Sequence, residues 1–189
     1  MKRGKPIITV FGGSKPVPGD PAYFDAQLLG QQLAEAGYSV QTGGYIGIME
    51  AVSRGAAEAG GHVIGITCEE IEKWRPVGPN PWVIEEIRFP TLKERLYALM
   101  TNCDAAIALP GGIGTLQEIV VMWAQLQIGA IDPKPLVLVG QDWENTFLSF
   151  FENLGAYIPR SDKAWLKFSI DVVKTILLIT TLVPVKNHT

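Results

Sequence analysis

Histidine and cysteine are scarce in this sequence, and their scarcity excludes several kinds of chemistry. Each occurs only twice among the 189 residues. A Ser-His-Asp hydrolase needs a histidine beside its nucleophile, and a catalytic metal site needs a cluster of histidine and carboxylate ligands. His62 begins a predicted strand, away from the strand ends that carry such sites, and His188 lies in the C-terminal tail. The sequence therefore predicts neither a histidine-dependent hydrolase nor a metal site.

Charge blocks and long apolar runs are also missing. With 16 basic and 19 acidic residues and no basic cluster, nothing favours a nucleic-acid partner. The apolar tail at residues 176–185 is too short to span a bilayer, and the N-terminal apolar run stops at Gly12, which is unlike a signal peptide. Cys68 and Cys103 match no metal or redox spacing and fit a reducing compartment. We expect a cytoplasmic protein without a membrane partner.

Glycine, in contrast, is abundant, and glycine turns separate predicted strands from predicted helices. Strands are predicted at residues 6–11, 38–42, 62–67, 83–87, 105–108, 134–139 and 166–169. Helices are predicted at residues 22–36, 48–59, 91–102, 119–126 and 142–153, and after the capping residue Asp171. This alternation is typical of an α/β fold, and we predict one Rossmann-like, doubly wound parallel sheet across residues 1–189. Residues 68–81 show neither the apolar periodicity of a helix nor that of a strand, and they are predicted to form a loop, a lid or a partner contact.

Three glycine turns follow predicted strands, at the sheet edge where doubly wound proteins bind ligands. They are Gly12-Gly13-Ser14, Thr42-Gly43-Gly44 and residues 110–115, which read PGGIGT. Glycine lets backbone approach a ligand closely, and the unpaired N–H groups of a first helical turn attract anions. The sequence therefore predicts that the three turns converge on one anion-binding crevice.

Two familiar nucleotide-binding motifs do not occur. The first strand is followed by Phe-Gly-Gly-Ser and not by G-x-G-x-x-G, and the second strand ends at Thr42 without a ribose-binding acid. No G-x-x-x-x-G-K-[ST] loop is present either. We therefore predict neither a dinucleotide cofactor nor P-loop phosphoryl transfer, and we expect no cofactor.

Two charged residues near the third turn have two interpretations each. Glu118 follows Thr115 by three residues, so it is either a capping-box partner of Thr115 or an acid with a chemical role. Arg95 lies beside Lys93 and Glu94 on the preceding helix. It is either an ordinary surface residue or a guanidinium that holds phosphate and offsets the charge of Glu118. The residues alone leave both questions open.

Residues 110–118, which read PGGIGTLQE, match the PGGxGTxxE signature of the LOG ("Lonely Guy") family, long mislabelled as lysine decarboxylases. Arg95 falls at the spacing of that family's upstream arginine. The resemblance covers roughly residues 6–140, and it includes residues 10–14, 21–23, 42–49 and 59–65. It implies a Rossmann-like homodimer that binds nucleoside 5′-monophosphates and, in active members, hydrolyses the N-glycosidic bond to free base and ribose 5-phosphate.

The resemblance also implies roles for individual residues. Glu118 would stabilise an oxocarbenium-like transition state and activate water, and Arg95 would position the substrate. The residues implied to bind the phosphate or nucleotide are Ser14, Gly43, Gly44, Gly111, Gly112, Ile113, Gly114 and Thr115. The substrate would be a cytokinin-riboside monophosphate or an AMP-like nucleotide. Molybdenum-cofactor carrier proteins resemble this family too, so the alternative is a carrier or sensor that binds a phosphorylated ligand without turnover.

Some positions depart from the family pattern. Active cytokinin-activating members usually have Arg-Lys where Leu96 follows Arg95, and the family methionine four residues beyond the arginine would be Leu99. Glu50 replaces a position that is often glycine. We expect these changes to alter the base pocket and the nearby helix, while Met49 is expected to pack in the core.

The helix that follows the third turn is apolar almost all round between residues 119 and 128. Such a helix must be covered on more than one side. The core alone could cover it, but the family resemblance implies a dimer interface along this helix.

Overall fold

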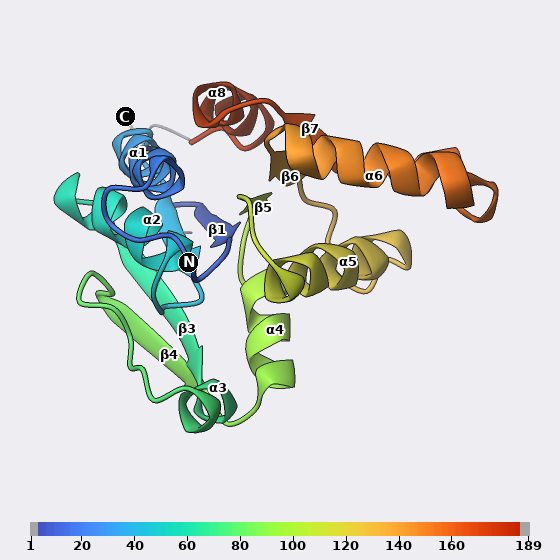
Figure 1. Ribbon diagram of the computed structural model, residues 1–189. Coiled ribbons are helices and arrows are strands. Elements are labelled where there is room, and N and C mark those ends of the chain that lie inside the picture. The colour runs from blue at the N-terminus through green and yellow to red at the C-terminus, as the bar shows by residue number, and fades with distance from the viewer. Residues whose placement is uncertain (1–3, 186–189) are drawn as a thin grey trace.

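A single parallel sheet of seven strands organises the computed structural model, which describes residues 4–185 (Figure 1). The strands are β1 (Ile7–Phe11), β2 (Ser39–Thr42), β3 (Val63–Cys68), β4 (Glu85–Phe89), β5 (Ala105–Ala108), β6 (Leu136–Val139) and β7 (Leu166–Ser169). Their order in the sheet is β4-β3-β2-β1-β5-β6-β7. The chain winds outward from β1 to β4 and then returns to pair β5 with the other side of β1. The direction of winding therefore reverses between β1 and β5, and the predicted α/β, Rossmann-like fold is confirmed.

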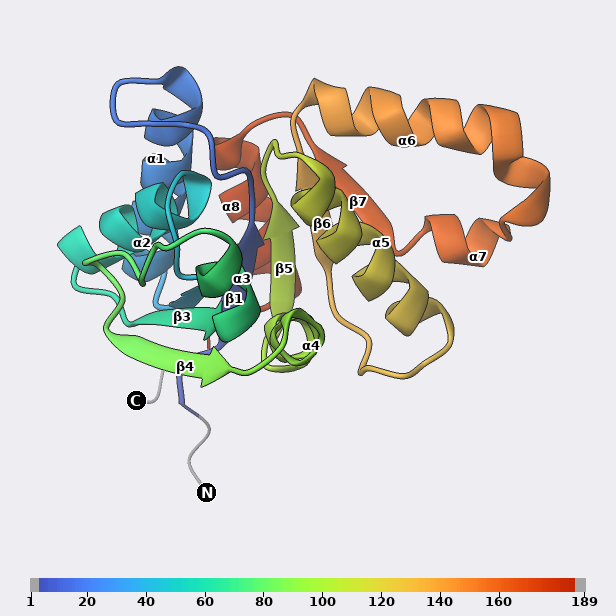
Figure 2. The same cartoon turned by 60° about the horizontal axis from the view of Figure 1, so that its bottom comes forward.

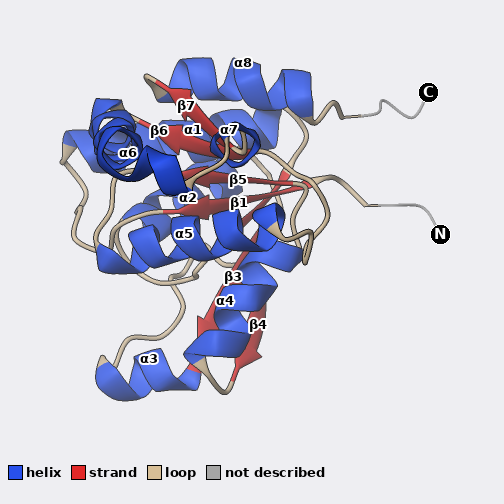
Figure 3. Cartoon of the chain, turned by 90° about the vertical axis from the view of Figure 1, so that its right-hand side faces the viewer, coloured by secondary structure: helices blue, strands red, loops and turns tan. Residues whose placement is uncertain are grey.

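Helices cover both faces of this sheet. They are α1 (Pro21–Glu35), α2 (Ile48–Glu58), α3 (Glu69–Trp74), α4 (Leu92–Thr101), α5 (Ile113–Gln127), α6 (Gln141–Leu154), α7 (Arg160–Lys163) and α8 (Val172–Leu182). Helices α1, α2 and α8 pack on one face, and α4, α5 and α6 pack on the other, the layer that faces the viewer in Figure 3. The α6 and α7 helices form a hairpin that extends beyond β7 (Figure 2).

Alternation along the central strands divides the core into these two layers. On β5, Ala105 and Ile107 join the cluster under α1, α2 and α8, whereas Ala106 and Ala108 join the cluster under α4, α5 and α6. Successive side chains of a strand point to opposite faces, so a strand buried on both faces is apolar throughout. The unbroken run of apolar residues on β5 is the sequence signature of its central position.

Helices α1 and α2 pack with their backbones in contact, because two glycines leave no side chain between them. A Cβ atom on Gly30 of α1 would overlap the carbonyl oxygen of Val52, and one on Gly55 of α2 would overlap that of Gln27. This close contact holds α2, and with it the turn that precedes it, against the first βα unit.

The structure differs from the predicted elements in several places. Residues 68–81 are not wholly loop, because β3 continues to Cys68 and α3 follows directly. Strand β4 is displaced by two residues from the predicted 83–87. A short 3-10 helix (Gly155–Tyr157) and α7 were not predicted. The predicted cap at Asp171 is confirmed, since its carboxylate accepts a hydrogen bond of 2.7 Å from the backbone N–H of Lys174.

Replacement of either helix-contact glycine by alanine is expected to lower the free energy of unfolding by about 2 kcal/mol. Overpacking strain of about 3 kcal/mol exceeds the helix-propensity gain of about 1 kcal/mol, because the new methyl group meets backbone oxygen. Denaturant unfolding of Gly30→Ala and Gly55→Ala measures the loss. Gly78→Ala is the control, because its Cβ would meet no atom within 4 Å. Equal stability of the parent protein and all three variants would contradict the close contact.

Candidate functional site

The three glycine turns meet at the carboxyl ends of β1, β2 and β5. The N–H group of Gly13 donates to the carbonyl of Pro110 over 3.1 Å, and a Cβ on Gly13 would lie 3.2 Å from the Cα of Gly111. The turn after β2 joins them, because a Cβ on Gly47 would lie 2.6 Å from the Cα of Ser14. Gly47 also has a φ of +77°, which disfavours other residues. The backbones of all three turns thus form one surface where the winding reverses.

The first turn of α5 offers uncovered backbone N–H groups to this surface. Gly112 is the N-cap residue, and no side chain among residues 4–185 caps the helix there. Gly112, Ile113 and Gly114 are exposed, and a Cβ on either glycine would meet no atom within 4 Å. Packing within this chain therefore does not require glycine at either position. Their lack of side chains leaves room for a ligand to approach amides that carry a partial positive charge.

The Thr115 side chain packs against the buried side of this turn. Its side chain is buried, and a Cβ on Gly111 would overlap its hydroxyl oxygen. The side-chain-free Gly111 therefore allows Thr115 to lie directly under the turn.

Glu118 is not a capping-box residue, so that interpretation was wrong. Helix α5 begins at Ile113, which makes Thr115 its third residue and Glu118 its sixth, and Thr115 makes no capping hydrogen bond. The Glu118 side chain is half-buried. Loss of solvation raises its pKa to about 7, while the positive charge of Arg95 acts in the opposite direction. Near neutral pH this carboxyl can therefore both accept and release a proton.

Arg95 is buried, so the surface interpretation was also wrong. Only 5% of its side chain is exposed. Its Nε donates to the carbonyl of Ile66 over 2.7 Å and its Nη2 to that of Gly43 over 3.2 Å. The guanidinium carbon also lies 5.6 Å from the ring centre of Tyr45. Arg95 thereby links α4 to the ends of β2 and β3 and fixes a positive charge within electrostatic reach of Glu118.

Gly43 and Gly44 are buried, and both lie against protein atoms. A Cβ on Gly43 would overlap Nη2 of Arg95 and lie 2.6 Å from Sδ of Met49. Gly44 has a φ of +79°, and its carbonyl accepts hydrogen bonds from the backbone and side chain of Asn80. Met49 is half-buried beside Gly43, so it belongs to the wall of this region and not to the core as expected.

Arg75 is not among the residues predicted from the sequence. It directly follows α3, in the segment predicted as a loop, and its Nη1 donates to the hydroxyl of Ser14 over 3.3 Å. No periodicity in residues 68–81 could have placed this side chain, because its position depends on how α3 folds back toward the first glycine turn.

The residues that depart from the family pattern lie outside the crevice or at its margin. Leu96, Leu99 and Met100 are buried in the core cluster beneath α4, α5 and α6. Glu50 accepts a hydrogen bond of 3.3 Å from the hydroxyl of Tyr23. The three apolar side chains therefore contribute to packing of α4 on the sheet.

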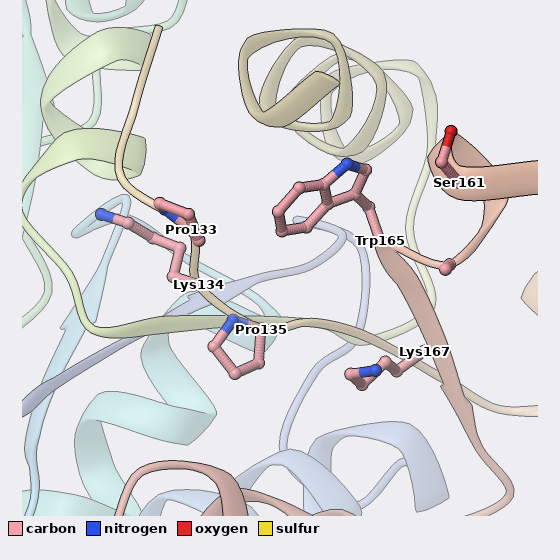
Figure 4. Close-up of a pocket in the computed structure, with 7 residues that line it drawn as sticks. Pro133, Lys134, Pro135, Ser161, Trp165 and Lys167 are labelled. Atoms are coloured by element: carbon pink, nitrogen blue, oxygen red, sulfur yellow. The ribbon is translucent and has the colours of Figure 1, made fainter. Parts of the chain in front are cut away.

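A separate cavity of about 350 Å³ opens at the opposite, amino ends of β6 and β7 (Figure 4). Pro133, Pro135 and Trp165 form its walls, together with Lys134 and Lys167. Lys134 is already occupied, since its Nζ donates to the carbonyls of Met100, Thr101 and Cys103. His62 lies at this same edge, 3.2 Å from Glu85.

Among residues 4–185, no group of three or more His, Cys, Asp or Glu residues is placed to hold a metal ion. No helix in that range is long and apolar enough to cross a membrane.

The family described as "possible lysine decarboxylase" matches residues 49–175. The chain belongs to this family, known as LOG. The probable cytokinin riboside 5′-monophosphate phosphoribohydrolase LOGL5 of Oryza sativa subsp. japonica is 35% identical over 82% of this chain and 59% of its own length. A cytokinin riboside 5′-monophosphate phosphoribohydrolase of Arabidopsis thaliana is 33% identical over 82% of this chain and 68% of its own length. The chain thus spans about three fifths of the first of these relatives and two thirds of the second.

Solved structures of similar fold cover the chain more completely. The molybdenum cofactor binding protein of Rippkaea orientalis is 27% identical, with a TM-score of 0.75 over 97% of this chain and 99% of its own. The molybdenum cofactor carrier protein of Chlamydomonas reinhardtii is 26% identical, with a TM-score of 0.72 over 94% of this chain and 98% of its own. Both groups of proteins named in the sequence resemblance are therefore similar to this chain.

Replacement of Glu118 by glutamine is expected to stabilise the protein more at pH 8 than at pH 5. Burial raises the carboxyl pKa from an ordinary value of 4.5 to about 7 in the folded state. The unfolded chain therefore ionises first, and this group opposes folding increasingly as pH rises from about 4.5 to about 7. Urea unfolding of both proteins between pH 4.5 and 8.5 measures the difference.

The control is Glu152→Gln on α6, which removes an exposed carboxyl. Its stability difference from the parent protein should vary much less over this pH range. A difference for Glu118→Gln that is constant with pH would show that Glu118 titrates normally.

Proposed function

We propose that this protein is a nucleoside 5′-monophosphate phosphoribohydrolase that releases free base and ribose 5-phosphate. The observation that carries the proposal is the half-buried Glu118, held within reach of the buried Arg95 and beside the uncovered N-terminus of α5. This reaction needs an anion-binding site, an acid with a pKa near 7 and a fixed cation. The names of the plant relatives support the same reaction class.

In the proposed mechanism the 5′-phosphate lies on the N–H groups of residues 112–115, and the ribose extends toward Glu118. The bond between C1′ and the base nitrogen breaks, and the base leaves with the bonding electron pair. Glu118 stabilises the positive charge that develops on the ribose and removes a proton from the attacking water, whose oxygen bonds to C1′. That proton finally reaches the base. Arg95 orients the substrate and keeps part of the Glu118 population ionised.

Loss of the Glu118 carboxylate is expected to reduce base release at least 100-fold, the usual contribution of a general base. Chromatographic detection of free base from AMP and from prenylated AMP tests this for Glu118→Gln. Glu152→Gln is the matched control and should retain full activity. The proposal fails if no nucleoside monophosphate yields free base, or if Glu118→Gln releases base as fast as the parent protein.

The pH dependence of kcat/KM is expected to follow ionisation of Glu118. Because the carboxylate is the active form, kcat/KM should rise about tenfold per pH unit below pH 7 and level off above it. Initial rates between pH 5 and 9 measure this profile. A profile that is flat from pH 5.5 to pH 8, or that falls over this interval, would contradict the assigned role.

A second function is favoured by a specific observation, which is the nearly complete overlap with the two molybdenum cofactor proteins. In that case the same crevice would hold a phosphorylated pterin without turnover. A pterin that co-purifies with the protein, combined with no base release from nucleotides, would support this carrier function over hydrolysis.

We also propose that α5 forms a homodimer interface. Ile113, Val120 and Ile128 are spaced seven and eight residues apart, so they share one helix face, and Ile113 and Ile128 are 84% and 71% exposed. This face begins beside the crevice, because Ile113 is the first residue of α5.

Sedimentation at micromolar concentration is expected to show a dimer. Val120→Glu should shift the protein to monomer, because the new carboxylate would be buried in the interface without a partner. Val173→Glu on α8 adds the same charge at another exposed valine and should leave the dimer intact. A monomeric parent protein would rule the interface out.

A further inference from the structure

We propose that Arg75 is a phosphate-binding residue of the crevice, supplying a guanidinium that grips the same anion as the N-terminus of α5. The inference rests on the proposed function only in that a phosphate monoester occupies the crevice. It assigns a role to the segment at residues 68–81, which was predicted to form a loop, a lid or a partner contact.

The position of Arg75 supports this role. Its Nη1 donates to the hydroxyl of Ser14, which belongs to the first glycine turn. That turn is in backbone contact with the third, through the hydrogen bond between Gly13 and Pro110. The guanidinium therefore lies at the rim formed by the turn that follows β1 and the turn that precedes α5, where the uncovered amides are.

The donors of Arg75 are only partly used. Its Nε is completely buried and has no hydrogen-bond partner among residues 4–185, and no carboxylate in that range pairs with its charge. By contrast, Arg54 pairs with Glu58, and Arg88 pairs with Glu72. The terminal nitrogens Nη1 and Nη2 keep further N–H donors, from which phosphate oxygens could accept charge-assisted hydrogen bonds.

The surroundings of Arg75 keep its guanidinium in place. The guanidinium carbon lies 5.6 Å from the ring centre of the neighbouring Trp74, while Ser14 accepts from one nitrogen. A second cation also offsets the negative charge of Glu118, which would otherwise repel a dianionic phosphate. Arg95 is engaged with two carbonyl groups in the interior, so Arg75 is the arginine placed to meet the phosphate.

The test measures binding without turnover. Titration calorimetry with ribose 5-phosphate and with inorganic phosphate compares the parent protein, Arg75→Ala, Arg75→Lys and Lys73→Ala. Lys73 is the matched control, because it lies two residues away on α3 and its exposed ammonium pairs with Glu69. Thermal unfolding of each variant verifies that the protein remains folded.

Arg75→Ala is expected to weaken ribose 5-phosphate binding about 10- to 100-fold, as loss of a charge-assisted pair does. Arg75→Lys should retain part of the affinity, and Lys73→Ala should change it less than twofold. The inference is overturned if Arg75→Ala binds within twofold of the parent, if Lys73→Ala loses as much affinity, or if the parent protein binds neither probe.

The result is separable from the fate of the proposed function. Arg75-dependent binding of ribose 5-phosphate without base release from any nucleotide would contradict the proposed hydrolase activity and support this inference. Base release from AMP with an unchanged KM in Arg75→Ala would do the reverse.

Discussion

The burial of the Arg95 guanidinium is the constraint on which the crevice depends. A charge that is 95% removed from solvent must be satisfied by hydrogen bonds, and here the carbonyls of Ile66 and Gly43 accept them. Both carbonyls lie at the carboxyl ends of their strands or just beyond them, so the arginine ties α4 to the edge where the glycine turns meet. Gly43 can have no side chain, because a Cβ there would occupy the position of the guanidinium.

The same buried charge sets the chemistry of its surroundings. Loss of solvation raises the pKa of Glu118, the positive charge of Arg95 lowers it, and the resulting pKa is about 7. The uncovered amides of α5 and the half-used Arg75 then provide positive potential for an anion. The crevice therefore balances one ionisable acid against two arginines and a helix N-terminus, which suits a substrate that brings its own negative charge.

The sequence predicted those features that depend on local pattern. Alternating strands and helices gave the fold, and the glycine turns after β1, β2 and β5 gave the location of the crevice. Helix starts were less predictable, because Gly112 caps α5 by backbone alone and moves Glu118 into the second turn. Arg95 resembled a surface residue because its neighbours Lys93 and Glu94 are exposed, and only the packing of α4 on β3 shows that it points inward. Arg75 could not be placed, since its contact with Ser14 joins segments 61 residues apart.

In the proposed reaction the crevice cleaves the bond between ribose and base while it keeps the phosphate ester intact. Incubation of AMP with the purified protein, followed by ³¹P and ¹H NMR, distinguishes this cleavage from dephosphorylation. We expect free adenine together with the phosphorus signal of ribose 5-phosphate, and no inorganic phosphate. Adenosine with inorganic phosphate, or AMP that remains unchanged over many hours at high protein concentration, would contradict it.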